Sequence, residues 1–249
     1  MANLEGKVAL ITGASSGIGA ATARKLANAG VTVGIAARRL DRLEELKSQI
    51  EEDGGKAIVL EMDVTDIKSV ENAVAHLVAE GTTIDILFNN AGLMPLSEVD
   101  DFKIDEWHRM VDVNMKGLLN TTAAALPYMI AQKSGHVFNT SSIAGRKVFK
   151  GLTVYCATKH AVTAFSDGLR MEIGKKHNIR VTCIQPGAVS TELYEQISDP
   201  VARQQMEDLR KQMTFLEGED IANTILYALE APAHVNMAEM FIMPTQQEW

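Results

Sequence analysis

Cysteine and histidine are too sparse and too scattered in this sequence to suggest a metal centre. The 249 residues include two cysteines, Cys156 and Cys183, which make no disulfide framework and lack the spacing of metal ligands. The six histidines are dispersed, and neither an H-E-x-x-H motif nor a Cys/His cluster is present. We therefore expect no bound metal.

Long apolar runs and an excess of positive charge are also missing. No apolar run approaches the ~20 residues of a transmembrane helix, and the first residues lack the basic and apolar regions of a signal peptide. Acidic residues outnumber basic ones by 32 to 24, for a formal net charge of −8. This balance argues against a nucleic-acid partner and gives no sign of a polybasic membrane anchor. We expect a cytoplasmic protein.

The overall amino-acid composition is that of an ordinary globular protein. Hydrophobic residues make up 46% and charged ones 22%, and the length suffices for one large domain with a full core. Short apolar runs predict strands at residues 7–12, 31–37, 56–62, 84–89, 136–140, 179–184 and 240–243. Helical periodicity falls between them, at 18–29, 39–52, 67–80, 104–113, 115–132, from the region of Tyr155 to 176, and 219–230. Residues 186–216 show little periodicity.

This alternation of strands and helices predicts the fold. Strand–helix–strand units form right-handed crossovers on a parallel sheet. We expect an α/β protein with a single-domain Rossmann fold over residues 1–249, in which a doubly wound, seven-stranded parallel sheet carries helices on both faces. No linker-like segment, repeat or low-complexity tract interrupts the pattern.

A glycine-rich turn lies between the first predicted strand and the first predicted helix. It reads T-G-A-S-S-G-I-G, with Gly13, Gly17 and Gly19 spaced as G-x-x-x-G-x-G. Gly13 permits a tight turn, Gly17 lets the backbone approach a pyrophosphate, and the helix N-terminus offers free N–H groups. A purely structural turn is the alternative, but the position between strand and helix favours a dinucleotide site.

The end of the second predicted strand indicates which dinucleotide binds. An acidic residue there would bind the ribose hydroxyls of NAD, but the chain has Arg38 and Arg39. Guanidinium groups suit a 2′-phosphate, so we expect NADP(H). Arg39 could instead open a charged helix and pair with glutamates. Asp63, with Val64 nearby, could accept a hydrogen bond from the adenine amino group or could cap a turn or helix.

Tyr155 and Lys159 are four residues apart, which places both on one face of a helix. A tyrosine titrates near ~10, and a neighbouring cation stabilises the phenolate and moves the pKa toward the working pH. Such a tyrosine can exchange a proton with an alcohol oxygen. For the pair alone, a chance occurrence on an amphipathic helix remains an alternative.

Together with Asn89-Asn90-Ala91-Gly92 after the fourth strand, these motifs resemble the short-chain dehydrogenase/reductase family over the whole chain. The resemblance implies a catalytic set of Asn114, Ser142, Tyr155 and Lys159. Pro186 to Thr191 matches the family segment that meets the nicotinamide carboxamide, and Arg38 is similar to the NADP(H)-preferring branch. The implied cofactor residues are Gly13, Ser15, Ser16, Gly17, Ile18, Gly19, Ala37, Arg38, Arg39, Asp63, Val64, Asn90, Ala91, Gly92, Thr140, Tyr155, Lys159, Pro186, Gly187, Val189 and Thr191.

The resemblance also implies a reaction. A hydride would pass between NADPH and the carbonyl carbon of a ketone or aldehyde, or in reverse from a secondary alcohol or hydroxy acid. Tyr155 would donate or accept the proton, and the Ser142 hydroxyl would bind the reacting oxygen. Lys159 would bind the nicotinamide ribose and lower the Tyr155 pKa, while Asn114 would hold a water that connects Lys159 to solvent.

For the substrate we expect a mostly apolar pocket under a lid at about residues 188–216. Its predicted residues are Met94, Ser142, Ala144, Val148, Tyr155, Leu193 and Tyr194, with Leu96 and Phe149 as further apolar neighbours. Arg146, Lys147 and Lys150 could attract a substrate carboxylate, although a solvated loop is the favoured interpretation.

Two segments indicate a branch of the family. The run S-S-I-A-G-R and the ending E-M-F-I-M-P-T-Q resemble the branch of clavulanic acid dehydrogenase and the NADP-dependent 3-hydroxy acid and serine dehydrogenases. Met243 replaces an arginine that many of its members have, which puts an acidic substrate or the usual subunit contacts in doubt.

Two other functions and one assembly remain to be considered. A 3-oxoacyl-carrier-protein reductase shares the catalytic set, but the V-D-G-G segment near its end is missing here. A non-catalytic NADP(H)-sensing protein would be expected to lose Tyr155 or Lys159, and both are present. The family is commonly tetrameric, so we expect a homotetramer or homodimer that packs helices beginning near residues 114 and 153.

Overall fold

The computed structural model describes residues 3–81 and 83–248 of the chain. It contains a seven-stranded sheet in the order β3-β2-β1-β4-β5-β6-β7, and every neighbouring pair is parallel. The strands are β1 (Val8–Thr12), β2 (Thr32–Ala37), β3 (Lys56–Glu61), β4 (Ile86–Asn89), β5 (Gly135–Thr140), β6 (Ile179–Pro186) and β7 (Glu239–Ile242). The predicted α/β Rossmann fold is confirmed, with strand bounds shifted by at most two residues.

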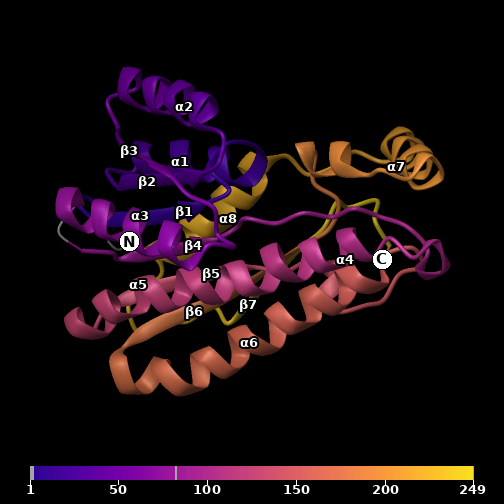
Figure 1. The fold of residues 1–249 in the computed structure, drawn as a ribbon. Helices are drawn as coiled ribbons and strands as arrows, with labels where there is room; N and C mark the ends of the chain where they lie inside the picture. The colour runs from indigo at the N-terminus through magenta and orange to yellow at the C-terminus, as the bar shows by residue number, and fades with distance from the viewer. Residues whose placement is uncertain (1–2, 82, 249) are drawn as a thin grey trace.

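Helices cover both faces of the sheet (Figure 1). On one face lie α1 (Gly17–Asn28), α2 (Leu40–Glu52) and α8 (Gly218–Glu230). On the other lie α3 (Ile67–Gly81), α5 (Leu118–Gln132) and α6 (Thr153–His177). Because successive side chains of a strand point to opposite faces, each face has its own core.

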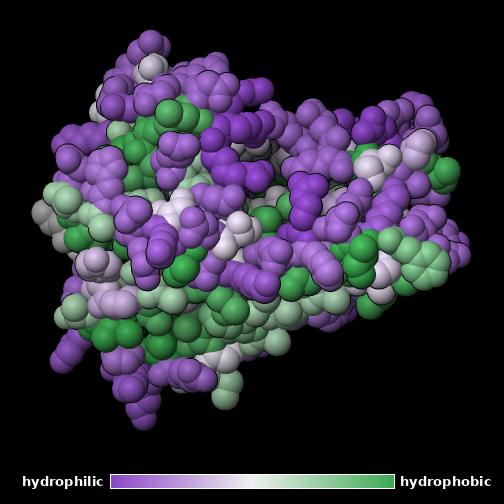
Figure 2. Space-filling view, viewed as in Figure 1, coloured by the Kyte–Doolittle hydropathy of each residue, from purple (hydrophilic) through white to green (hydrophobic). Residues whose placement is uncertain are grey.

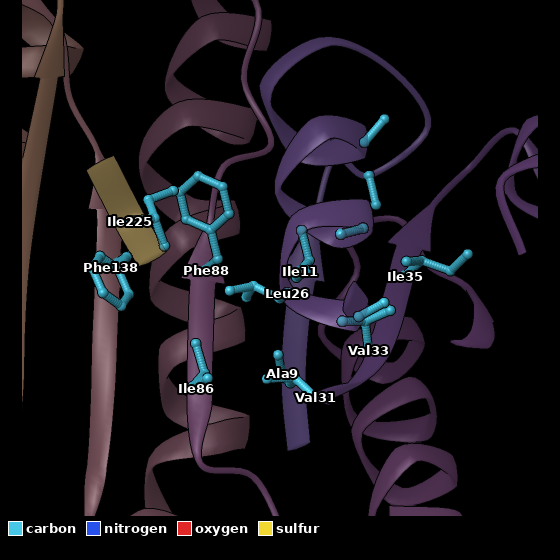
Figure 3. Close-up of a cluster of buried hydrophobic side chains, with 14 of the residues drawn as sticks. Ala9, Ile11, Leu26, Val31, Val33, Ile35, Ile86, Phe88, Phe138 and Ile225 are labelled. Carbon is cyan, nitrogen blue, oxygen red and sulfur yellow. The ribbon is translucent and has the colours of Figure 1, made fainter. Parts of the chain in front are cut away.

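The first core shows how the strands and helices meet. In Figure 3, Ile11 of β1, Phe88 of β4 and Phe138 of β5 pack in one cluster with Leu26 of α1 and Ile225 of α8. All five side chains are buried. Strands such as β1 and β2 bury side chains on both faces and are therefore largely apolar runs, which is why the sequence reveals them.

The strand order also positions the ligand site. From β1 the chain builds outward to β3, then returns to place β4 on the other side of β1. A crevice opens at such a switch point, outside the carboxyl ends of the strands. Asn90, just after β4, crosses this point, since its side-chain Nδ2 donates to the carbonyl of Thr12 at 3.1 Å.

Two helical segments differ from the prediction. The expected break near residue 114 is absent, because α4 (Ile104–Val111) continues through a π-helical segment, Asp112–Gly117, into α5. In the predicted irregular region, α7 (Pro200–Gln212) follows a short 3-10 helix, Glu192–Gln196. No residue of α7 is fully buried, and its apolar contacts come from the partly buried Ala202, Met206 and Leu209, so the apolar signal in its sequence is short.

Two structural features are absent from the described part of the chain. None of its helices combines the length and apolarity that a membrane crossing requires. Residues 3–81 and 83–248 also contain no group of three or more His, Cys, Asp or Glu side chains placed to hold a metal ion.

Candidate active site

A cleft of about 940 Å³ lies at the carboxyl ends of the strands and gathers most of the predicted site residues. Figure 2 shows the surface hollowed between α2 and α7, with strongly hydrophilic residues at the border. Of the residues predicted for the cofactor, the substrate and catalysis, all line the cleft except Gly19, Asn114 and Val148.

The glycine-rich turn forms one wall of the cleft. Gly13 and Gly17 have φ angles of +64° and +53°, a region that other residues rarely adopt. A Cβ atom on Gly13 would come within 2.9 Å of the Ala91 Cα, and one on Gly19 would collide with the Gly13 carbonyl oxygen. Gly19 therefore lies behind the turn and keeps it close to α1. The N-terminus of α1 begins at Gly17 and has no side-chain cap, which suits a pyrophosphate.

The cleft wall beside the turn carries the two arginines. Arg38 lines the cleft, and Arg39 donates from Nη2 to the hydroxyls of Ser15 and Ser16, both at 3.0 Å. Arg39 also pairs with Glu192 at 2.9 Å, so the predicted alternative of a glutamate partner is present in the structure. These cationic and hydroxyl donors, together with the glycine turn, fit a phosphorylated dinucleotide.

Asp63 has the role of a turn cap in this structure. Its Oδ1 accepts hydrogen bonds from the backbone N–H and the hydroxyl of Thr65, at 2.9 and 2.7 Å. Burial raises the pKa of Asp63, but these bonds and the charge of Arg38 outweigh burial and lower the pKa. Asp63 still lines the cleft, so its predicted contact with adenine stays a prediction.

Helix α6 places Tyr155 and Lys159 on the same side, as their spacing predicts. The Lys159 Nζ lies 5.6 Å from the centroid of the Tyr155 ring and donates to the Thr140 carbonyl at 2.8 Å. Ser142 begins a 3-10 turn, Ile143–Gly145, and its hydroxyl accepts from the Ala144 N–H at 3.1 Å. The Ser142 side chain also hydrogen-bonds the Tyr155 phenol. The segment after β5 and helix α6 thus bring three predicted catalytic groups together.

The net shift of the Tyr155 pKa is opposite to the expected one in this structure, because burial outweighs the other influences on the phenol. Burial raises the pKa of the phenol above its ordinary value, although the hydrogen bond from Ser142 opposes that shift. Burial also lowers the pKa of Lys159 to about 8. Tyr155 packs among Leu93, Met94 and Cys156, and this apolar environment disfavours the charged phenolate.

Asn114 lies just behind the cleft, in the π-helical segment. It is buried, its Oδ1 accepts from the Leu93 N–H at 2.9 Å, and its Nδ2 donates to the Leu93 carbonyl and the Thr158 hydroxyl. A Cβ atom on Gly92 would lie 3.3 Å from the Asn114 Oδ1 and 3.8 Å from the Lys159 Nζ. Asn114 is therefore a near neighbour of Lys159 without reaching the cleft surface. Single-turn π segments occur frequently at functional sites.

The opposite end of the cleft is apolar, as predicted for the substrate. Met94, Ala144 and Tyr155 belong to a buried cluster against which Leu193 and Tyr194 pack. Val148 is outside this cluster and outside the cleft, with a relative exposure of 65%. Its assignment to the substrate pocket is corrected here, because the loop after Ile143–Gly145 turns its side chain to solvent.

The cations of that loop are mostly engaged elsewhere. Arg146 contacts the side chains of Gln185 and Glu239 and lies over the Phe241 ring, 5.0 Å from its centroid. Lys150 lines the cleft but pairs with Glu98 at 2.9 Å. Arg146 and Lys147 do not line the cleft. A carboxylate-binding role for this loop therefore has little geometric support.

Several cleft residues were not predicted. Glu106, Arg109 and Val113 line it from one stripe of α4 and the π segment, and their i, i+3, i+7 spacing was the signal in the sequence. Met206 and Leu209 line it from α7. Gln247 lies close to the end of the chain, and nothing in its local sequence indicates a place in the cleft.

Gln246 and Gln247 hold both ends of the predicted lid. Gln247 accepts from the Ala188 N–H at 2.9 Å, and Gln246 accepts from the Thr214 N–H at 2.7 Å. The two ends also meet each other, because Val189 and Leu216 form a parallel bridge. The two ends of residues 188–216 are thus held next to each other and to the C-terminal segment.

Comparisons with known proteins agree with this geometry. The family model described as short chain dehydrogenase matches residues 7–202. An uncharacterized oxidoreductase of Listeria monocytogenes is 44% identical over 247 residues, which is 99% of each chain. A glycine betaine reductase of Emericella nidulans is 45% identical over 98% of this chain, but the match spans only 19% of that protein. A solved structure of serine dehydrogenase in its closed form with NADP+ is 33% identical, with a TM-score of 0.90 over 97% of this chain and 96% of that one.

Proposed function

Because this chain belongs to the short-chain dehydrogenase family and binds NADP(H), we propose that it reduces a small ketone or aldehyde to the alcohol. The reverse reaction is the oxidation of a secondary alcohol or hydroxy acid. One observation carries this proposal. Tyr155, Ser142 and Lys159 line the same cleft as the glycine-rich turn. The bound cofactor supplies the hydride.

We propose that the cofactor binds along the cleft, between the glycine-rich turn and the segment from Pro186 to Thr191. The turn at Gly13 to Gly19 and the N-terminus of α1 would hold the pyrophosphate. Arg38 and Arg39 would bind the 2′-phosphate, and the segment from Pro186 to Thr191 would meet the nicotinamide. Thr140 and Lys159, already joined by a hydrogen bond of 2.8 Å, would face the nicotinamide ribose.

Tyr155 would act as the general acid in reduction. The raised pKa keeps its phenol protonated at neutral pH, which is the form that a proton donor needs. The proton moves from the Tyr155 oxygen to the carbonyl oxygen as the hydride reaches the carbonyl carbon. Ser142 would donate a hydrogen bond to the same oxygen, and the Lys159 ammonium would stabilise the phenolate that remains.

Asn114 can accept one further hydrogen bond, which suits the binding of a water. Its Nδ2 already donates two hydrogen bonds and its Oδ1 already accepts one, so a single acceptor site on Oδ1 is left. A water held there, close to Lys159, would return a proton from solvent to the phenolate.

The substrate would lie under residues 188–216 and against the apolar end of the cleft. Leu193 and Tyr194 come from this segment, and Met94 and Phe149 come from the other side. The names of two relatives, serine dehydrogenase and glycine betaine reductase, both indicate small polar compounds. We therefore propose a small carbonyl compound rather than a long acyl chain.

A cofactor-oxidation assay tests the proposed reaction. Oxidation of NADPH and of NADH is followed with neutral ketones, aldehydes and keto acids in parallel, using Tyr155→Phe as the control. We expect NADPH-dependent reduction of at least one carbonyl class by the native protein. NADPH binding without reduction of any carbonyl would overturn the reductase proposal and favour a sensing protein.

We also propose that the chain assembles into a homodimer or homotetramer through α5 and α6. Hydrophobic residues gather over these helices in Figure 2. The exposed large hydrophobic residues of the chain include Leu119 of α5 and Met171 of α6, with relative exposures of 38% and 74%. Small residues such as Ala123 and Ala161 would allow close helix packing. Light scattering coupled to gel filtration tests the assembly, and a monomer at micromolar concentration would contradict it.

A further inference from the structure

Glu192 forms an ion-pair bridge across the mouth of the cleft. Its Oε2 lies 2.9 Å from the Arg39 Nη1, and its Oε1 lies 3.6 Å from the Arg42 Nη1. Arg39 precedes α2 and Arg42 lies in its first turn, whereas Glu192 begins the 3-10 helix Glu192–Gln196 within residues 188–216. The bridge therefore joins the second strand–helix unit to the segment that covers the substrate end.

The Arg39 guanidinium is held on several sides. Its Nε and Nη2 donate to the Ser15 hydroxyl at 3.3 and 3.0 Å, Nη2 also donates to the Ser16 hydroxyl, and Nη1 faces Glu192. The hydrogen bond with Arg39 is the main reason why the Glu192 pKa is lowered, so this carboxylate is ionised at neutral pH. The Glu192 carboxylate thus already pairs with the Arg39 guanidinium, which is hydrogen-bonded to the glycine-rich turn.

This arrangement has a consequence for cofactor choice. NADP(H) differs from NAD(H) by a 2′-phosphate, a dianion that Arg38 and Arg39 would bind in the site proposed above. Two anions that share one arginine repel each other, and the repulsion is weaker for NAD(H), which lacks that phosphate. The Glu192 carboxylate therefore weakens the binding of NADP(H) more than the binding of NAD(H).

We propose that Glu192 competes with the 2′-phosphate for Arg39 and so limits the preference for NADP(H) over NAD(H). This inference rests on NADP(H) as the cofactor and is independent of the proposed carbonyl chemistry. Glu192 is then a specificity-determining residue that lies outside the second strand, where the cofactor preference of this fold is usually read.

Direct binding measurements test the competition. Dissociation constants of NADPH, NADH and adenosine 2′,5′-bisphosphate are measured by calorimetry for the native protein and for Glu192→Gln at low salt. We expect the variant to bind NADPH and the bisphosphate roughly fivefold more tightly, the size expected for a partly exposed ion pair. NADH binding should change by less than about twofold, and the gain should shrink in high salt.

Two controls separate the competition from a general change of charge. Glu45→Gln removes a negative charge from the exposed face of α2, away from the cleft, and should leave all three constants unchanged. In an Arg39→Gln background, Glu192→Gln should produce no further gain, because the contested guanidinium is gone. Weaker NADPH binding by Glu192→Gln would overturn the proposal and indicate that Glu192 helps to retain the cofactor. Equal effects on NADPH and NADH, or an unchanged gain without Arg39, would also overturn it.

Discussion

The Lys159 ammonium lies 5.6 Å from the centre of the Tyr155 ring, and both side chains are buried. Burial therefore disfavours the charged form of each side chain. Burial raises the pKa of the phenol and lowers the pKa of the ammonium to about 8. A protonated tyrosine beside a lysine that is charged below about pH 8 is prepared to donate a proton and to stabilise the resulting phenolate.

This relationship predicts the pH dependence of reduction. Lys159 carries its charge below its folded pKa of about 8 and loses it above that value. The rate of carbonyl reduction should therefore be level below pH 8 and should fall as pH rises through it. A pH profile of kcat from 6 to 10 measures the effect, and Lys159→Met should give a low rate without the step. A native rate that rises above pH 8 would contradict the role of Lys159.

The glycine-rich turn leads to a prediction about stability. Alanine normally stabilises a helix by about 1 kcal/mol relative to glycine. Gly19 lies in α1, but a Cβ atom there would collide with the Gly13 carbonyl, so Gly19→Ala should destabilise the fold by roughly 1–3 kcal/mol and weaken NADPH binding.

Gly168 provides the matched control for that substitution. It lies in α6, and a Cβ atom at this position would meet nothing within 4 Å. Gly168→Ala should therefore raise the free energy of unfolding by up to about 1 kcal/mol. Urea unfolding of both variants measures the difference. A Gly19→Ala variant that is more stable than the native protein would contradict the predicted clash between a Cβ atom at position 19 and the Gly13 carbonyl oxygen.

His136 should make the protein less stable in mild acid. Its ring stacks on Phe138 at 3.9 Å between centroids, its Nε2 lies 2.7 Å from the Thr182 hydroxyl, and its buried Nδ1 has no partner among the described residues. Burial, followed by the charge of Arg180, lowers the pKa of His136 well below its ordinary value. Below the unfolded pKa of ~6.5, only the unfolded chain gains this proton, so stability decreases by about 1.4 kcal/mol per pH unit.

Unfolding free energies measured between pH 5.5 and 8 check that slope. His136→Gln should flatten it, even if the variant is less stable at every pH. The exposed His76 serves as the control, because His76→Gln should leave the slope unchanged. An unchanged slope in His136→Gln would assign the acid sensitivity to other groups.

The sequence predicts most of this fold because the strands are buried on both faces. All five residues of β1 are buried, and such a strand is a continuous apolar run in any window. Helix α7 was not predicted in this way, since its apolar residues Ala202, Met206 and Leu209 are only partly buried and form a short stripe. Its beginning could have been predicted, because Asp199 caps it through the Ala202 N–H and Pro200 is its first residue.

The candidate site divides in a similar way. Motifs on one element, such as Tyr155 and Lys159 on α6, were predictable because their spacing fixes their geometry. Gln247 and Glu192 were not, since their partners at Ala188 and Arg39 are distant in sequence. The direction of the Tyr155 pKa shift was also beyond the sequence, because it depends on the side chains that exclude water from the phenol.

The role of Tyr155 as proton donor is tested most directly by Tyr155→Phe. Removal of the hydroxyl preserves the shape of the ring but leaves no proton to transfer. Carbonyl-dependent NADPH oxidation and NADPH binding are measured side by side for the native protein and the variant. We predict that kcat falls by at least about 100-fold, while the NADPH dissociation constant changes by less than about twofold. A variant that binds NADPH normally and retains its turnover would contradict the proposed mechanism.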